Sequence, residues 1–312
     1  MDIQILLAIQ SFRESVGGFL SSFMSFLSTI AVDYYILVPA LILFWAVDKR
    51  KGLTALASYG SALFIGATLK ASFCVYRPWV KAPEIAPPES IKAGAGSYSF
   101  PSGHSFSTAS FYFGLAAGDR KNKSLFRFAV VMVLLTMFSR LYFGVHTPQD
   151  VLVGLLIGLV AVTIVCRVLS WVEEHPEKDW IVLLVVVALC ALLLPYLQFK
   201  NYPMDYVDGK LLVDPKKMTV DGFKDPGRFF GVVVGWFIER RFIRFDISGT
   251  TEQKVARCLF GALLFIFYWT SVIDPLGKAI GVGYAHFFLQ ASAPALFMTV
   301  YPLVFKKIEA KS

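Results

Sequence analysis

Long apolar runs recur along most of the chain, and they constrain its fold more than any other feature. Several runs approach the roughly 20 residues that a helix needs to cross a bilayer. The composition agrees, because 56% of the residues are hydrophobic and only 17% are charged, and the mean hydropathy is +0.61. A soluble domain is usually more polar. We therefore predict an all-α protein, a polytopic membrane helix bundle.

The apolar runs predict nine membrane spans. They lie at residues 32–48, 53–75, 104–118, 125–145, 149–172, 180–198, 228–245, 257–273 and 283–305. The seventh is the weakest, because Arg228 and the Arg240-Arg241 pair crowd a short apolar stretch. Residues 3–30 mix apolar and small polar positions, which favours an interfacial helix. We expect one integral membrane domain over 1–312: an interfacial helix in 1–30, a six-helix core in 31–198, and a loop with about three additional spans in 199–312.

Clusters of Lys and Arg predict which ends of the spans face the cytoplasm. The clusters are Lys49-Arg50-Lys51, Arg120-Lys121 with Lys123, Arg240-Arg241 with Arg244, and Lys306-Lys307. They fall on one side only if 228–245 crosses, and the loop 77–104 and the turn 140–150 then face outward. The loop 199–226 is also placed outside, and its five Lys conflict with the rule. The net charge of +8 then reflects anchoring to anionic lipid, with the bilayer and no nucleic acid as partner.

Two cations lie near the end of the second predicted span. Lys70 precedes Arg77 by seven residues, which is two helical turns, so both side chains can lie on one face. A charge near a membrane is costly and is usually functional or paired. The alternative is that Lys70 only snorkels to the interface while Arg77 anchors a helix end.

The segment Pro101-Ser102-Gly103-His104 is typical of a turn that enters a helix. Free amides at a helix start bind anions, and the small Gly103 permits close approach. Ser102 can cap the helix and donate to a phosphate oxygen. The alternative is an ordinary N-cap beside an incidental histidine.

The segment His146-Thr147-Pro148-Gln149-Asp150 predicts another helix start, with Thr147 as N-cap. Asp150 can then orient His146 and leave the second ring nitrogen free as a nucleophile. Arg140, six residues before His146, would bring a permanent cation to the same pocket. One alternative is a simple capping box beside a surface histidine.

A metal site is a further alternative for His104, His146 and Asp150, and the neighbouring cations disfavour it. The four cysteines stand singly within or beside apolar runs, without metal-ligand spacing or a disulfide framework. We predict no metal and no cofactor.

Taken together, these residues resemble the type 2 phosphatidic acid phosphatase superfamily. Its signature consists of Lys-x6-Arg-Pro, Pro-Ser-Gly-His and Ser-Arg-x5-His-x3-Asp. The matching residues here are Lys70, Arg77-Pro78, Pro101 to His104, Ser139-Arg140, His146 and Asp150. The resemblance covers residues 30–172 and implies a six-helix phosphatase core. Glucose-6-phosphatase and sphingosine-1-phosphate phosphatase are similar in having extra spans.

The resemblance implies a metal-independent phosphatase that forms a phosphohistidine intermediate. His146 would be the nucleophile, Asp150 would orient it, and His104 would act as general acid and then base. The phosphate ligands would be Lys70, Arg77, Ser102, Gly103 and Arg140. The expected substrate is a lipid phosphate or diphosphate monoester at the outer face of a cytoplasmic membrane, with a bacterial origin favoured.

Other functions with the same anion pocket are alternatives: a lipid or phosphate transporter or scramblase, a soluble sugar-phosphate phosphatase, and a vanadate-dependent haloperoxidase. Neither the oligomeric state nor the particular substrate follows from the residues. The loop 199–226 is expected to be a connector or a second wall of the pocket.

Overall fold

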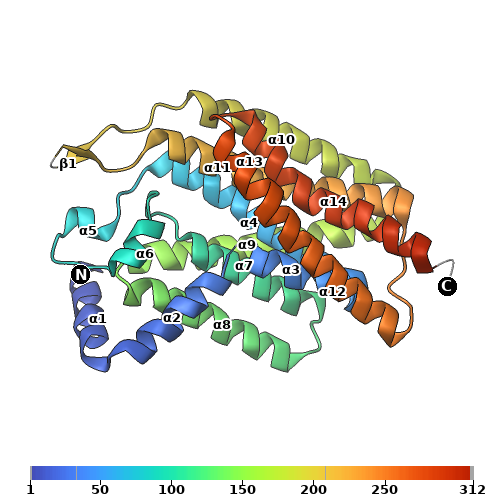
Figure 1. Ribbon diagram of the computed structural model, residues 1–312, viewed down its shortest axis with the longest axis horizontal. Helices are drawn as coiled ribbons and strands as arrows, with labels where there is room; N and C mark the ends of the chain where they lie inside the picture. The colour runs from blue at the N-terminus through green and yellow to red at the C-terminus, as the bar shows by residue number, and fades with distance from the viewer. Residues whose placement is uncertain (1, 33, 208, 310–312) are drawn as a thin grey trace.

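The computed structural model describes residues 2–32, 34–207 and 209–309. The positions 1, 33, 208 and 310–312 of the predicted ranges lie outside the described residues. The described chain is a bundle of α-helices with one two-stranded hairpin (Figure 1). The predicted all-α class is therefore confirmed.

The helices and strands follow in this order. They are α1 (Asp2–Val16), α2 (Gly18–Ile30), α3 (Tyr34–Ile42) continuing as η1 (Leu43–Val47), α4 (Lys49–Phe73), α5 (Pro78–Lys81), α6 (Glu89–Gly94), α7 (Gly103–Gly118), α8 (Lys123–Tyr142), α9 (Pro148–Glu174), η2 (Pro176–Lys178), α10 (Asp179–Phe199), β1 (Tyr206–Val207), β2 (Lys210–Leu211), α11 (Pro215–Ile238), η3 (Glu239–Ile243), α12 (Thr251–Tyr268), η4 (Trp269–Ile273), α13 (Asp274–Ala279) and α14 (Tyr284–Glu309).

Each predicted span coincides with a helix: α3, α4, α7, α8, α9, α10, α11, α12 and α14. Six helical segments of the described chain are long and apolar enough to cross a membrane. A seventh is counted if Gly18–Ile30 and Tyr34–Val47, bent by 61°, form one broken span. The chain is thus a polytopic helical membrane protein with a C-terminal helical extension.

The helices α7 and α11 are not among those six segments. With 16 residues, α7 is short, and it packs against α4, α8 and α9 in the centre of the bundle. Its small polar residues, such as Ser105, Ser107 and Ser110, are buried there. Protein neighbours rather than lipid therefore surround much of this helix.

The prediction of a loop over 199–226 is wrong for its second half, because α11 begins at Pro215. The Asp214 side chain caps the helix by accepting a hydrogen bond from the Lys216 amide, and Pro215 occupies the first helical position. An ion pair of 2.6 Å between Lys217 and Asp221, four residues apart, supports the first turns. Half of the charged residues that suggested a loop therefore lie on a helix, namely Lys216, Lys217, Asp221, Lys224 and Asp225.

A stripe of glycines fixes the position of α11 against α14. Gly227, Gly231 and Gly235 recur every four residues, and Cβ atoms there would meet α14: the Phe287 carbonyl, the Ala291 carbonyl and Met298, respectively. Small residues at this spacing let two membrane helices approach closely. Within the C-terminal extension, α11 and α14 therefore pack backbone to backbone.

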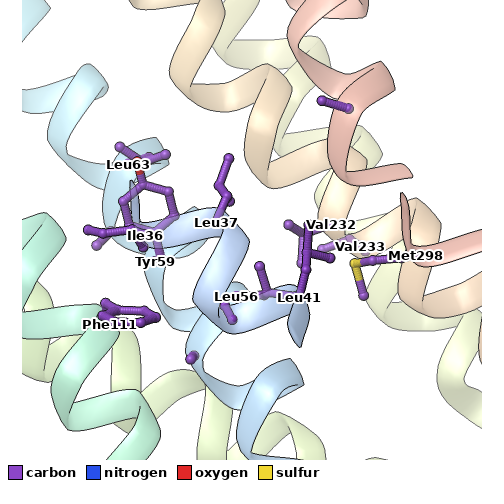
Figure 2. Packing of buried hydrophobic residues seen from close by; sticks show 14 of the residues in the cluster. Ile36, Leu37, Leu41, Leu56, Tyr59, Leu63, Phe111, Val232, Val233 and Met298 are labelled. Carbon is purple, nitrogen blue, oxygen red and sulfur yellow. The ribbon is translucent and has the colours of Figure 1, made fainter. Parts of the chain in front are cut away.

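The core and the extension share one buried hydrophobic cluster. Figure 2 shows side chains of this cluster from three helices: Ile36, Leu37 and Leu41 of α3, Leu56, Tyr59 and Leu63 of α4, and Val232 and Val233 of α11. The helix α11 also packs directly against α4. The extension therefore contacts the helix that carries Lys70.

The basic clusters gather at one end of the bundle. Lys49 pairs with the buried Glu239 at 2.5 Å, and Lys51 pairs with Asp119 at 2.8 Å. Lys306 donates to the Ile243 carbonyl at 2.8 Å. Lys70 lies near the opposite end of α4. The clusters that were predicted to be cytoplasmic therefore lie at the end remote from Lys70.

Candidate functional site

A cavity of about 380 Å³ lies at the Lys70 end of α4. Its lining includes Lys70, Arg77, Gly103, His104, Arg140 and His146. These six residues come from α4, the following loop, the start of α7, the end of α8 and the α8–α9 turn. The structure therefore brings together six of the eight predicted site residues in one cavity wall, and a seventh, Asp150, lies behind His146.

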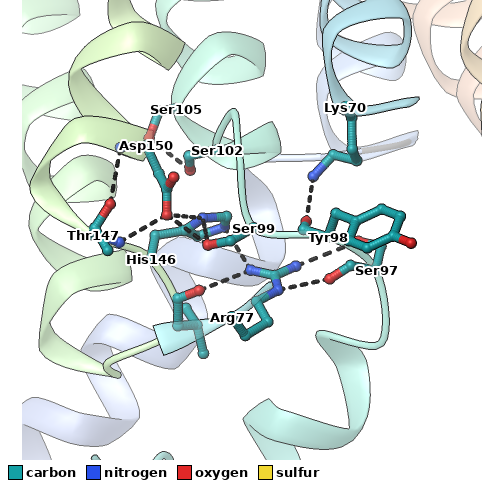
Figure 3. Close-up of polar contacts among 11 residues, drawn as sticks. Lys70, Arg77, Ser97, Tyr98, Ser99, Ser102, Ser105, His146, Thr147 and Asp150 are labelled. Atoms are coloured by element: carbon teal, nitrogen blue, oxygen red, sulfur yellow. Dashed lines mark hydrogen bonds and ion pairs between the residues drawn. The ribbon is translucent and has the colours of Figure 1, made fainter. Parts of the chain in front are cut away.

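The α8–α9 turn positions His146 and Asp150. Thr147 is the N-cap of α9, and it forms a reciprocal capping box with Asp150. The Oδ2 atom of Asp150 accepts hydrogen bonds from the Thr147 amide at 2.8 Å and from Ser99 Oγ at 2.5 Å. The same oxygen lies 3.4 Å from Nδ1 of His146 (Figure 3). Asp150 therefore closes the capping box of α9 and also lies beside the His146 ring.

The hydrogen bonds assign the proton of the His146 ring. Its Nε2 lies 2.9 Å from Nη1 of Arg77, and because a guanidinium only donates, Nε2 must accept. The remaining proton then lies on Nδ1, facing Asp150. Burial, with Arg77 next, lowers the pKa of His146 well below its ordinary value. The imidazole is therefore neutral, with its lone pair on the nitrogen that faces Arg77.

Arg77 and Lys70 organise the loop that precedes α7. Arg77 donates from Nε to the Ser97 carbonyl and from Nη1 to the Val145 carbonyl, both at 2.8 Å. Lys70 donates from Nζ to the Tyr98 carbonyl at 2.8 Å. Figure 3 shows both cations directed toward this segment. They line the cavity, so Lys70 does more than snorkel.

The start of α7 lies where the sequence predicts it. Gly103 is the first helical residue, and a Cβ there would meet one neighbour, Phe106, at 3.9 Å. The ring of His104 forms the next part of the cavity wall. Ser102 is the N-cap residue, yet its side chain makes no capping hydrogen bond.

The prediction that the Ser102 side chain caps α7 is wrong, whereas its predicted contact with phosphate stays a prediction. Its hydroxyl accepts from Ser105 Oγ at 2.9 Å and is fully buried. Among the described residues, the cavity lining includes Gly103 and Ser107 but not Ser102. The Ser102 amide donates to the Asp150 carbonyl at 3.0 Å. Ser102 therefore joins the start of α7 to α9.

Arg140 is buried and forms part of the cavity wall. Its Nη1 donates to Ser28 Oγ of α2, whereas its Nε is buried and has no hydrogen-bond partner within the described chain. A buried, unpaired N–H of a cation is costly unless a ligand supplies an acceptor. Arg140 thus brings a buried positive charge to the cavity wall, which favours an anion there.

Sequence reasoning missed Ser28, Ser97 and Ser99 as partners of the site. Ser99 follows the loop 77–98 and lies three residues before Ser102, so no spacing rule connects it with Asp150. Ser28 lies 112 positions from Arg140. Only tertiary packing brings these hydroxyls to the site.

The C-terminal extension supplies one wall of the cavity. The lining residues from α11 are Met218, Asp221, Gly222, Lys224, Asp225 and Arg228. Of the two readings of 199–226, the second wall is the one that the structure supports. A signal for this wall was present in the sequence, since a spacing of three and four residues places these positions on one face of a helix.

Within the described ranges, no group of three or more His, Cys, Asp or Glu is arranged to hold a metal ion.

Comparisons with known proteins agree with both parts of the chain. Residues 51–174 match the family model described as PAP2 superfamily. Residues 223–312 match the model described as PAP2 superfamily phosphatase, transmembrane extension. No solved structure matches the chain.

Two curated relatives match part of the sequence. An undecaprenyl-diphosphatase of Sulfolobus acidocaldarius is 30% identical over 140 residues, which cover 45% of this chain and 66% of the relative. A probable sphingosine-1-phosphate phosphatase of Dictyostelium discoideum is 28% identical over 176 residues, which cover 52% of this chain and 41% of the relative. The chain thus spans about two thirds or less of these relatives' lengths.

Proposed function

The chain belongs to the PAP2 superfamily, and from this premise we propose that it is a membrane phosphatase acting on a lipid phosphate or diphosphate. The observation that carries the proposal is the His146 ring at the wall of a cation-lined cavity: its Nε2 lone pair faces Arg77, and Asp150 lies beside its Nδ1. An oriented, neutral imidazole is what an in-line attack on phosphorus needs. The names of the two relatives support a lipid substrate.

In the first step, Nε2 of His146 attacks phosphorus and forms an N–P bond. The bond from phosphorus to the leaving oxygen breaks, and His104 gives that oxygen a proton. Asp150 stabilises the positive charge that develops on the His146 ring. Such acid–base assistance typically contributes about 10²–10⁴-fold.

In the second step, water attacks the phosphohistidine. His104, now unprotonated, accepts a proton from this water, and the N–P bond breaks to return neutral His146 and release phosphate. The same histidine thus serves as acid and then as base. No metal or cofactor enters either step.

Fixed cations stabilise the charge on the phosphoryl oxygens. Lys70, Arg77 and Arg140 all border the cavity. The amide of Gly103, at the start of α7, adds a donor at the positive end of the helix dipole. Preorganised donors of this kind contribute strongly to transition-state stabilisation.

The proposal places the site at the extracytoplasmic face. It rests on the gathering of basic clusters, among them Lys49, Lys51 and Lys306, at the end of the bundle remote from Lys70. Lys and Arg concentrate on the cytoplasmic side of membrane proteins. A lipid headgroup at the outer interface would then lie level with the cavity.

Phosphate release by the detergent-purified protein tests the function. The assay contains chelator and offers lipid phosphates and diphosphates, with glucose 6-phosphate as the soluble comparison. We expect chelator-resistant release from lipids, which His146→Ala abolishes while the thermal unfolding midpoint stays unchanged. Substantial release by the folded His146→Ala variant would overturn the nucleophile assignment.

A further inference from the structure

A second polar cavity, of about 510 Å³, lies at the end of the bundle remote from Lys70. The start of α4, the end of α9 and the segment from the end of α11 to Phe245 enclose it. Its lining holds twice as many cations as carboxylates. The cations are Lys49, Arg50, Arg240 and Arg244, and the carboxylates are Glu173 and Glu239. The proposed phosphatase chemistry uses none of these residues.

Each carboxylate of this lining engages one cation. Lys49 Nζ lies 2.5 Å from Oε1 of the buried Glu239. Arg50 Nη1 lies 2.7 Å from Oε1 of Glu173. These two pairs use the negative charge of the lining, so the charges of the two remaining arginines need another partner.

Arg240 and Arg244 keep a surplus of positive charge. Arg240 Nε lies 3.3 Å from Asp179, but Asp179 is outside the lining and also pairs with Arg241. Arg244 is exposed and forms no ion pair within the described ranges, and its Nε donates to the Arg240 carbonyl at 3.3 Å. When Arg241 and Asp179 are included, five cations face three carboxylates. Two positive charges therefore remain.

The backbone holds Arg244 in an unusual conformation. Its φ is 47°, in the left-handed region, and its amide donates to the Glu239 carbonyl at 2.8 Å where the η3 segment ends. Glycine is the usual residue at a helix end of this kind, because a Cβ is unfavourable there. The nearby Asp246 accepts from the Ser248 amide at 2.9 Å and lies outside the lining. An exposed guanidinium thus occupies a position that favours glycine, and it is available to a ligand.

An apolar groove of about 460 Å³ adjoins this polar cavity. It lies among α4, α9, α10 and α11, and nearly all the residues that line it are apolar. Leu53, Leu169 and Trp236 border both the groove and the polar cavity. Val185 and Leu189 of the groove are exposed on α10, which is long and apolar enough to cross a membrane. A lipid chain can therefore enter the groove from the side.

Arg167 is the one charged residue among those that line the groove. It lies within α9, seven residues before the last helical residue, Glu174. Its side chain is exposed, and it has no ion pair in the part of the chain that the structure describes. A charge within a membrane span is costly unless it reaches the interface or an opposite charge. An anionic lipid at this face would supply such a charge.

From the polar cavity and the adjoining groove we infer a binding site for an anionic phospholipid, with its phosphate in the cavity and one acyl chain in the groove. A zwitterionic lipid would leave the surplus positive charge unmatched, and a soluble anion would leave the groove unfilled. Basic pockets between membrane helices are typical sites for anionic headgroups. The inference does not rest on the proposed function, because the site lies at the opposite end of α4 from Lys70.

Dioleoyl phosphatidylglycerol and dioleoyl phosphatidylcholine are matched probes, since they share their tails and only the first carries a net negative charge. Their dissociation constants are measured by native mass spectrometry of the full-length protein in detergent. We expect phosphatidylglycerol to bind at least about tenfold more tightly, because each surplus basic residue near an anionic lipid contributes about fivefold. Equal affinities for the two lipids would overturn the inference.

Arg244→Gln should weaken the binding of phosphatidylglycerol about fivefold and leave that of phosphatidylcholine unchanged. Arg120→Gln is the matched control, because Arg120 is also exposed and lies outside both linings; it should change neither affinity. The same affinity for phosphatidylglycerol in both variants would contradict the site.

Trp236 reports where the acyl chain lies. Phosphatidylglycerol with brominated chains should quench tryptophan fluorescence more strongly than brominated phosphatidylcholine at the same concentration. Trp236→Phe should reduce this excess, whereas Trp269→Phe, at a buried residue outside the groove, should not. An unchanged excess in Trp236→Phe would refute the placement of the chain.

Glycerol 3-phosphate, which has no tail, tests whether the headgroup is sufficient. We expect it to displace phosphatidylglycerol only at a concentration at least about a hundredfold higher than that of the lipid, because burial of even a few methylene groups adds this much affinity. Displacement at equal concentration would show a site for soluble anions and would overturn the lipid assignment. None of these measurements uses phosphate release, so this inference and the proposed function can fail separately.

Discussion

Ser99 offers the sharpest test of how the site is held together. Its hydroxyl donates to Asp150 Oδ2 at 2.5 Å, and its side chain is almost wholly buried. Ser99→Ala removes this donor but keeps the Asp150 charge and the Thr147 amide that also binds it. The carboxylate then loses one of the bonds that fix it against His146.

The structure sets the magnitude of the effect. A hydrogen bond to a charged group typically contributes about 1.5–3 kcal/mol. In the proposed transition state the His146 ring becomes positively charged, and Asp150 stabilises this charge. If the whole free energy of the Ser99 hydrogen bond contributes to that stabilisation, its loss lowers kcat roughly 10- to 100-fold. The assay is phosphate release under chelator at saturating lipid, with thermal unfolding in detergent measured alongside.

Two further variants make the test specific. Ser110→Ala is the matched control, since Ser110 is equally buried and donates a single bond, to the Ser107 carbonyl at 3.0 Å on its own helix; its kcat should stay within about twofold. In an Asp150→Asn background, Ser99→Ala should lower kcat little further, because the effects of substitutions within one hydrogen-bond network are not additive. Wild-type kcat for folded Ser99→Ala, or full additivity with Asp150→Asn, would refute the reasoning.

Two other predictions concern packing and protonation. Gly231→Ala should destabilise the fold by about 1–3 kcal/mol, because the new Cβ meets the Ala291 carbonyl of α14. Gly18→Ala is the control, since a Cβ there meets nothing within 4 Å, and it should not destabilise the fold. Equal unfolding midpoints for the two variants would contradict the close approach of α11 and α14. Since burial and Arg77 lower the pKa of His146, its ring should stay neutral as the pH falls through the ordinary value of about 6.5. The NMR signals of the His146 ring nitrogens, assigned by their loss in His146→Ala, should therefore titrate below about pH 6.5. A titration midpoint at or above this pH would contradict the burial of the ring and its contact with Arg77.

The sequence was sufficient to predict where the apolar helices lie, because hydropathy is a property of contiguous residues. It was also sufficient to predict the α8–α9 turn, since Thr147, Pro148 and Asp150 carry a complete local helix start. Residues far apart in the sequence, such as Lys70 and His104, could be assigned to one site only through the resemblance to a family, because their spacing alone does not predict that they lie close together.

The parts that sequence reasoning missed depend on tertiary packing. The polar half of α11, with Lys217, Asp221 and Asp225, has the composition of a loop, and only its position against α4 makes it a cavity wall. In the sequence, Ser28 cannot be distinguished from other small residues of an amphipathic helix. It reaches Arg140 only because α2 packs against α8. For Ser102 the local signal was misleading, because Ser105 is also available to its hydroxyl.

The contact between Arg77 and Nε2 of His146 has a consequence for the empty protein. The lone pair required for attack is already engaged at 2.9 Å, by a guanidinium that is also held by Val145 and Ser97. If His146 attacks phosphorus as proposed, a bound phosphoryl group must first draw that guanidinium onto its own oxygens. The Nε2 lone pair would then be blocked in the empty protein and freed only by an anionic substrate, so a neutral molecule in the same cavity would leave it blocked.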